Sequence, residues 1–186
     1  MSEDAELMRR VRDGDEAALG ALMGRWELPV KRLLGRILQN SADADDLAQE
    51  AFVKVWQNRM RFDATAEFRP WVFAIAVNLA RNRLRWWRRR PLVLLNDWDE
   101  AGADPGDGSG TALEKRERAA AVREAVGGLP LDQREALVLF SYEGLSHAEI
   151  AAAVGGTPKS VEAKLYRARA ALKDSLRKWS RDSGPS

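Results

Sequence analysis

Residues 146–172 carry the pattern that most limits the fold of this chain. Ser146, with Glu149 three residues later, forms a capping box that opens a short helix. Gly155 and Gly156 then make a tight turn before a longer, basic helix. This order predicts a helix-turn-helix, whose second helix projects into the major groove of DNA. A plain helical hairpin and a helix-turn-helix that contacts protein are the alternatives.

The projecting helix is expected to bury Val161, Leu165 and Ala168 and to turn its other residues outward. Its lysines and arginines can reach phosphates, and Glu162 can accept a hydrogen bond from a cytosine amino group. The candidate DNA-binding residues on this helix are Lys159, Ser160, Glu162, Ala163, Lys164, Tyr166, Arg167 and Arg169.

A second basic stretch, residues 68–90, combines an amphipathic helix with a run of arginine. Pro70 suits the first helical turn, and apolar residues follow at helical spacing. Residues 79–90 hold six arginines and no acid, with Trp86 and Trp87 among them. Arginine binds phosphate bidentately, and flat aromatic rings stack on unpaired bases. The stretch therefore predicts contact with nucleic acid, and a core helix with a solvated basic end is the alternative.

The composition excludes several classes of site. The 186 residues, 45% of them hydrophobic, suffice for one packed domain or two small ones. The chain has no cysteine, which excludes a disulfide framework, a thiolate metal site and a cysteine nucleophile and fits a reducing cytoplasm. Its only histidine is His147, so a multi-histidine metal site or a serine–histidine triad is hard to build. The charged N-terminus predicts neither a signal peptide nor membrane insertion.

Helical spacing recurs along the chain without a strand pattern, which predicts an all-α fold. Residues 97–107 carry five acids and no base, and the stretch is rich in glycine. Such a composition cannot bury enough apolar surface to order itself, so we expect two small helical domains joined by a flexible acidic linker. The predicted boundaries are 1–91 for the first domain, 92–112 for the linker, 113–180 for the helix-turn-helix domain and 181–186 for a disordered tail.

Turn residues and charged residues predict where several helices begin and end and which side chains face water. Residues 13–15 predict a break between two short helices, and the next helix is expected to begin after Pro29. Asn40 with the following serine offers a cap for another helix. In residues 131–142 the apolar positions are expected inside, with Arg134 and Glu135 facing water.

Three motifs in series resemble the extracytoplasmic-function (ECF) sigma factors of bacterial RNA polymerase. They are DADDLAQEAFVKVW (43–56), FRPWVFAIAVNLARNRL (68–84) and LPLDQREALVLFSYEGLSHAEIAAAVGGTPKSVEAKLYRARAAL (129–172). The match covers about residues 5–178 in the order of the family. The resemblance implies a cytoplasmic, non-enzymatic factor without a cofactor. It further implies core RNA polymerase, promoter DNA and an inhibitory anti-sigma factor as partners.

The resemblance also implies roles for particular residues. Docking on the polymerase clamp is implied for Asp46, Leu47, Gln49, Glu50, Phe52, Val53 and Trp56. Capture of the −10 element is implied for Arg69, Asn78, Arg81, Asn82, Arg85 and Arg88. The helix-turn-helix would read the −35 element, and the acidic linker would follow the RNA exit path. Core packing is the alternative for Leu47, Phe52 and Trp56, and also for Trp71.

Two features depart from the family pattern. Members often carry a basic residue and a serine where this chain has Glu162 and Ala163, which leaves the base preference at −35 open. The pair Trp86–Trp87 within the arginine run is also unusual.

Two other functions compete with this reading. One is a self-contained transcription regulator, which would need an effector domain or a dimer interface. The other is an enzyme acting on nucleic acid, with magnesium held by Asp43, Asp45, Asp46 and Glu50. The position of these acids at a helix start is explained by capping and by the helix dipole, so we expect neither a catalytic nor a metal site.

Overall fold

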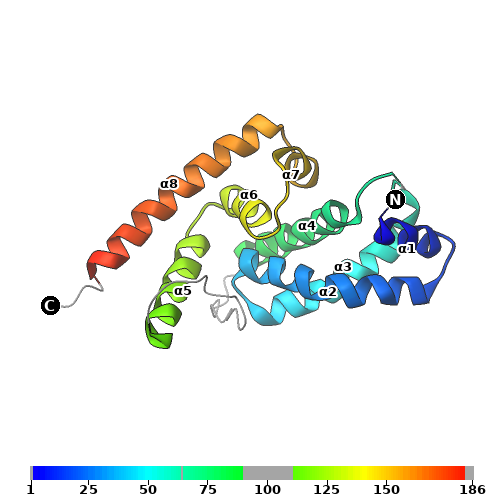
Figure 1. Ribbon diagram of the computed structural model, residues 1–186, viewed down its shortest axis with the longest axis horizontal. Coiled ribbons are helices and arrows are strands. Elements are labelled where there is room, and N and C mark those ends of the chain that lie inside the picture. The colour runs from blue at the N-terminus through cyan, green and yellow to red at the C-terminus, as the bar shows by residue number, and fades with distance from the viewer. Residues whose placement is uncertain (1, 64, 90–110, 183–186) are drawn as a thin grey trace.

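The computed structural model describes residues 2–63, 65–89 and 111–182, and all regular structure in these ranges is helical (Figure 1). The helices are α1 (Glu3–Arg12), α2 (Glu16–Leu38), α3 (Ser41–Gln57), the short 3₁₀ helix η1 (Arg59–Arg61), α4 (Phe68–Arg89), α5 (Ala112–Gly127), α6 (Leu131–Ser141), α7 (His147–Val154) and α8 (Pro158–Asp182). This confirms the all-α fold class. The predicted linker, apart from its last two residues, and the end of the predicted tail lie outside the described residues.

Local capping explains most helix boundaries. The Asn40 side chain accepts a hydrogen bond from the Asp43 N–H at 2.9 Å and opens α3, as predicted. Ser146 and Glu149 cap α7 reciprocally, which confirms the predicted capping box. The break at residues 13–15 is also present, between α1 and α2.

The predicted helix start after Pro29 is wrong, because α2 runs through this proline without interruption. A proline inside a helix gives up one backbone hydrogen bond and costs about 3 kcal/mol. Leu22 on one side of it and Val30 and Leu33 on the other are fully buried. Burial of apolar side chains on both sides of Pro29 offsets this cost and keeps the two halves in one helix.

Helices α1–α4 form an N-terminal module around an aromatic cluster. Trp26 of α2 packs edge-on against Phe68 and Phe73 of α4, with ring centroids 6.1 and 5.9 Å apart. Its indole N–H donates to Asp4 of α1 at 3.0 Å. The ring centroids of Phe62 and Trp71 are 5.1 Å apart, so Trp71 packs within this cluster. The cluster fixes α4 along the module and so positions its exposed face.

Helices α5–α8 form a C-terminal module that contains the predicted helix-turn-helix, α7 and α8. The turn between them needs glycine, since Gly155 and Gly156 have φ values of 86° and 111°. A Cβ atom on Gly156 would lie 2.7 Å from the Ser160 hydroxyl oxygen. That hydroxyl is fixed because it donates to the Thr157 carbonyl oxygen at 2.7 Å.

Replacing Gly156 with alanine should therefore destabilise the protein by about 1–3 kcal/mol. The new Cβ would meet a fixed hydroxyl in a backbone conformation that L residues avoid. Thermal unfolding followed by circular dichroism measures this loss. Gly20→Ala is the matched control: this glycine lies inside α2 with open space around it, so alanine should stabilise by roughly 0.5–1 kcal/mol. Equal melting temperatures for the Gly156 variant and the wild type would contradict the prediction.

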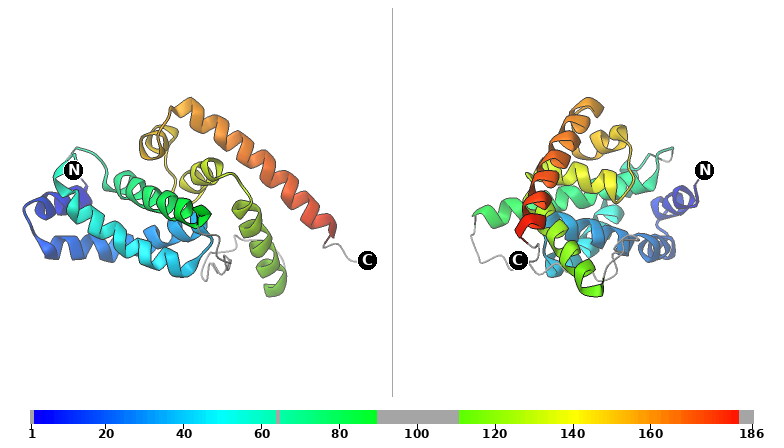
Figure 2. Two further views of the ribbon diagram at one scale, coloured as in Figure 1. Left: turned by 180° about the vertical axis from the view of Figure 1, so that it is seen from behind. Right: turned by 60° about the vertical axis from the view of Figure 1, so that its left-hand side comes forward.

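The two modules pack against each other (Figure 2). Helix α4 contacts α7, and α2 contacts both α5 and α6. Buried side chains from both modules belong to one continuous core. The arrangement places the arginine-rich helix α4 beside the helix-turn-helix.

Candidate functional site

The exposed face of α4 is the first part of the candidate site. Asn78, Asn82, Arg85 and Arg89 follow at helical spacing and are all exposed. The Arg85 guanidinium donates to the Asn82 side-chain oxygen at 2.5 Å. The structure thus brings three predicted −10 residues, Asn78, Asn82 and Arg85, onto one surface of amides and cations. Such a surface can bind base edges and phosphates. Arg88, also predicted, is exposed as well.

Arg81 lies at the edge of this face, one turn before Arg85, and contacts the C-terminal module. Its Nε and Nη2 atoms donate to the two carboxylate oxygens of Glu135 in α6, at 2.8 and 2.6 Å. Nη2 also donates to the Val154 carbonyl at the end of α7, at 3.1 Å. The hydrogen bonds to Glu135 raise the pKa of Arg81. In this arrangement Arg81, predicted to contact the −10 element, is engaged within the protein.

The expectation that Glu135 faces water is wrong, because its side chain is only 1% exposed. The carboxylate remains buried because Arg81 supplies two charge-assisted hydrogen bonds from the other module. No pattern in residues 131–142 signals this contact, since the partner lies 54 residues earlier in the chain.

Arg69, another predicted −10 residue, lies near Glu149 of α7. The pKa of Glu149 is lowered, first by the hydrogen bonds from the Ser146 hydroxyl and backbone N–H and to a smaller extent by the charge of Arg69. The structure therefore separates Arg69 and Arg81, which face the C-terminal module, from the exposed surface of α4.

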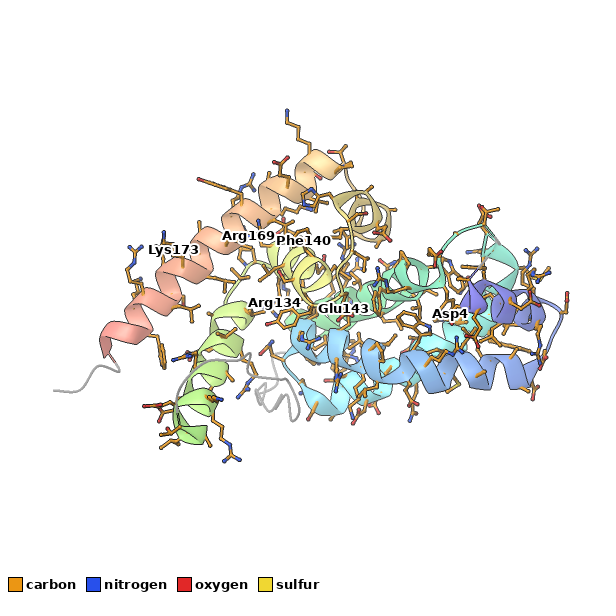
Figure 3. The ribbon with its side chains drawn as sticks, viewed as in Figure 1. Asp4, Arg134, Phe140, Glu143, Arg169 and Lys173 are labelled. Atoms are coloured by element: carbon orange, nitrogen blue, oxygen red, sulfur yellow. The ribbon has the colours of Figure 1, made fainter. Side chains whose placement is uncertain are left out.

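Further contacts join α2 to α6 and to the residues that follow α6 (Figure 3). Arg36 of α2 pairs with Glu143 at 3.3 Å and stacks over the Tyr142 ring at 4.1 Å. Arg134 donates to the Ile37 carbonyl at 2.7 Å, which is a second polar bridge between α6 and α2. Burial lowers the pKa of Arg134. The expectation that Arg134 faces water is therefore wrong, because the side chain is partly buried against α2. Sequence reasoning assigned no role to Arg36, Tyr142 or Glu143.

Helix α3 presents the predicted polymerase-docking residues unequally. Asp46, Gln49, Glu50 and Val53 are exposed and form one face of the helix. Leu47 and Phe52 are each only 2% exposed and belong to the core, which favours the packing alternative for both. Trp56 is half-buried, with the Arg59 guanidinium 4.4 Å from its ring centroid. The face available to a partner is therefore acidic, with one exposed apolar side chain, Val53.

A groove between α2 and α3 adjoins this face and was not predicted. It is lined by Gly24, Glu27, Leu28, Lys31, Asp45, Ala48 and Gln49. Leu28 is 53% exposed, which is high for a leucine. Its position outside the apolar stripe of α2 was a signal in the sequence, since a leucine that does not face the core is available to a partner.

On α8 the predicted −35 residues divide into exposed and locally engaged side chains. Lys159, Glu162, Tyr166, Arg167 and Arg169 are exposed, Tyr166 at 76%. Ser160 is hydrogen-bonded to Thr157 in the turn, and Ala163 is half-buried.

Two cations of α8 also contact neighbouring helices. The Lys164 ammonium lies 4.0 Å from a carboxylate oxygen of Asp132, and Arg169 stacks on Phe140 of α6 at 5.1 Å (Figure 3). Most of the predicted recognition surface is thus presented to solvent along the first half of α8.

The acidic residues at the start of α3 take part in ion pairs. Asp43 pairs with Arg83 of α4, and Asp45 pairs with Lys31 of α2. Within the described ranges no group of three or more histidine, cysteine or acidic side chains is placed to hold a metal ion. Nor does any helix in those ranges have the length and apolar character needed to cross a bilayer.

Comparison with family models gives two matches in order along the chain. Residues 22–90 match sigma-70 region 2, and residues 119–172 match sigma-70 region 4. The first match covers α4 and the docking face of α3, and the second covers the helix-turn-helix. Both halves of the candidate site therefore lie within matched regions.

Individual proteins resemble the chain over almost its whole length. RNA polymerase sigma-H factor of Pseudomonas aeruginosa is 31% identical, over 97% of this chain and 97% of that protein. ECF RNA polymerase sigma-E factor of Escherichia coli is 33% identical, over 91% of this chain and 92% of that protein.

Two solved structures share the fold. CnrH in complex with the cytosolic domain of CnrY has a TM-score of 0.72 at 27% identity, covering 95% of this chain and 99% of that one. The sigma factor RpoE of Bartonella quintana, in complex with the anti-sigma factor NepR, has a TM-score of 0.64 at 22% identity, covering 85% and 96%.

Proposed function

Because this chain belongs to the extracytoplasmic-function sigma factors of bacterial RNA polymerase, we propose that it binds core polymerase through α3 and directs it to promoters through α4 and α8. Residues 1–91 and 113–180 are the two working domains. The exposed face of α4 binds the −10 element, and the first half of α8 binds the −35 element. The protein is an initiation factor in the cytoplasm, without catalytic activity of its own.

One observation carries this proposal: a single chain presents two separate basic surfaces and one acidic surface. Arg85, Arg88 and Arg89 are exposed on α4, and Lys159 with Arg167 on α8. The exposed acids of α3 do not favour contact with DNA, because DNA phosphates repel carboxylates. They are available to a protein partner instead. A sigma factor binds promoter DNA at two places and core polymerase at a third. These three surfaces fit that function.

The energies of strand separation define what the factor can do alone. Opening DNA costs about 1.4 kcal/mol per base-pair step, so a bubble of about ten steps needs on the order of 14 kcal/mol. Stacking one extruded base returns roughly 1–3 kcal/mol. One or two captured bases cannot open the bubble, so the factor traps an opening that polymerase drives.

We further propose that an anti-sigma protein holds the factor inactive. The similar protein CnrH was solved in complex with the cytosolic domain of CnrY. An inhibitor that covers α3 would prevent polymerase from reaching the docking face, and one that stabilises the packed modules would keep Arg81 engaged with Glu135. Co-purification from native lysate should recover such a protein in stoichiometric amount.

Transcription in vitro with core polymerase on a genomic DNA library tests the function directly. We expect specific transcripts that appear only when the chain is added. Demonstrably folded protein that starts no transcript, and does not bind core polymerase, would overturn the proposal. A magnesium-dependent nuclease assay on the same preparation separates this function from the enzymatic alternative.

A further inference from the structure

A cleft between α3 and α4 is the feature that the function described so far does not use. It has a volume of about 460 Å³ and is lined by Leu47, Glu50, Leu79, Asn82, Arg83 and Trp86. That volume falls in the range of roughly 300–1,000 Å³ typical of binding pockets. We refer to it as the α3–α4 cleft.

Helical spacing explains why these residues meet. Leu79, Arg83 and Trp86 follow at intervals of four and three residues, so they share one side of α4. Arg83 pairs with Asp43, which joins this side of α4 to the start of α3. Arg81 instead contacts α6 and α7. The cleft therefore faces away from the contact between the modules.

The cleft has an apolar interior and a polar rim, with Glu50 on its α3 side and Asn82 on its α4 side. Leu47 and Leu79 supply aliphatic surface, and Trp86 adds an indole that is 39% exposed. Glu50 lines the cleft from α3, and Asp46, one turn earlier, is also exposed. Among the described residues that line the cleft, the one cation is Arg83, and it is paired with Asp43.

These charges decide which partner the cleft fits. Carboxylates at the rim repel phosphates, and a paired arginine attracts them weakly, so a nucleic-acid strand is disfavoured. A protein segment with basic side chains and an apolar anchor is favoured, because its cations can meet Glu50 and Asp46. The cleft is also continuous with the docking face of α3, since Glu50 belongs to both.

We propose that the polymerase-docking surface extends from α3 across the α3–α4 cleft onto α4, where Trp86 is an anchor for a basic, apolar-tipped segment of core polymerase. This inference rests on the proposed function and names a contact that the docking helix does not include. It also assigns a role to Trp86, which lies on the promoter-binding helix but beside the cleft. Tryptophan in a desolvated pocket is among the residues that contribute most to interface affinity.

Binding of the full chain to core polymerase tests the proposal. Because the sequence has no cysteine, Ala120→Cys on the exposed side of α5 allows one fluorescent label. Trp86→Ala should weaken the complex by about 30-fold or more, the effect expected of an interface hot spot. Trp86→Phe, which retains an aromatic anchor, should recover most of the affinity. Leu113→Ala removes another exposed apolar side chain, on α5, and should change nothing.

Other outcomes are equally informative. Unchanged polymerase affinity in Trp86→Ala would overturn the proposal. If that variant bound core polymerase normally but lost promoter opening, the cleft would belong to the DNA-binding surface instead. Failure of the wild-type chain to bind core polymerase would overturn the proposed function itself, which keeps the two failures distinct. Melting curves of each variant establish that the fold is retained.

Discussion

Replacing Arg81 with alanine should separate the two modules. The substitution leaves Glu135 as a carboxylate that is 1% exposed and has lost both hydrogen bonds from the guanidinium. Removing one partner of a buried ion pair costs about 3–5 kcal/mol. The protein can avoid this cost by opening, because water then reaches Glu135. Small-angle scattering should show a larger radius of gyration, and amide exchange should increase in α6 and α7.

The matched control is Arg85→Ala, one turn further along α4. Arg85 is exposed and donates to Asn82 of its own helix, so its loss should leave the modules packed. The charge swap Arg81→Glu with Glu135→Arg should restore the packed form at least in part. Identical scattering and melting for Arg81→Ala and wild type would mean that the pair does not hold the modules together.

Glu135→Gln extends this experiment to function. Arg81 is itself a candidate promoter contact, so its removal confounds any transcription assay. Glu135 is not among the residues proposed to bind polymerase or DNA, and its amide replacement weakens the pair while Arg81 stays in place. We expect more transcript at limiting factor, because an Arg81 released from Glu135 is available to the promoter. Less transcript would indicate that the packed form is the active one.

The helices could be predicted from the sequence because their signals are local. Asn40 and Ser146 cap helices within three residues of themselves, and the glycines after α7 impose the turn by their own conformational freedom. Pro29 misled because a local cost was outweighed by burial of side chains on both sides of it. Local signals therefore gave the elements but not every boundary.

The candidate site could be predicted only in part for a related reason. Helical spacing places Asn78, Asn82 and Arg85 together without reference to any other element. Spacing cannot distinguish Arg81 from Arg85, since the difference is a partner 54 residues away. The burial of Glu135 and the α3–α4 cleft depend on how separate helices pack. Short sequence patterns do not predict such packing.

Promoter binding by the assembled polymerase should depend steeply on salt, and the two basic surfaces should account for separate shares of that dependence. Each neutralised phosphate lowers log K by about 0.9 per unit of log salt on duplex DNA and about 0.7 on a single strand. The triple variant Arg85→Gln, Arg88→Gln and Arg89→Gln should therefore reduce the slope by roughly 2–3. Anisotropy of a labelled promoter fragment, titrated at several salt concentrations, measures the slope.

Comparing the salt slopes of three triple variants distinguishes direct phosphate contacts from an effect of net charge. Lys159→Gln, Arg167→Gln and Arg169→Gln on α8 should lower the slope by about as much again, because that surface meets duplex DNA. Arg32→Gln, Arg116→Gln and Arg118→Gln remove the same charge from exposed positions on α2 and α5 and should leave the slope near that of wild type. An equal reduction in all three variants would show that net charge, rather than the α4 and α8 surfaces, governs binding. If only the α8 triple acted, the exposed arginines of α4 would not contact phosphate, and capture of the −10 element would depend on the other α4 candidates, such as Asn78 and Asn82.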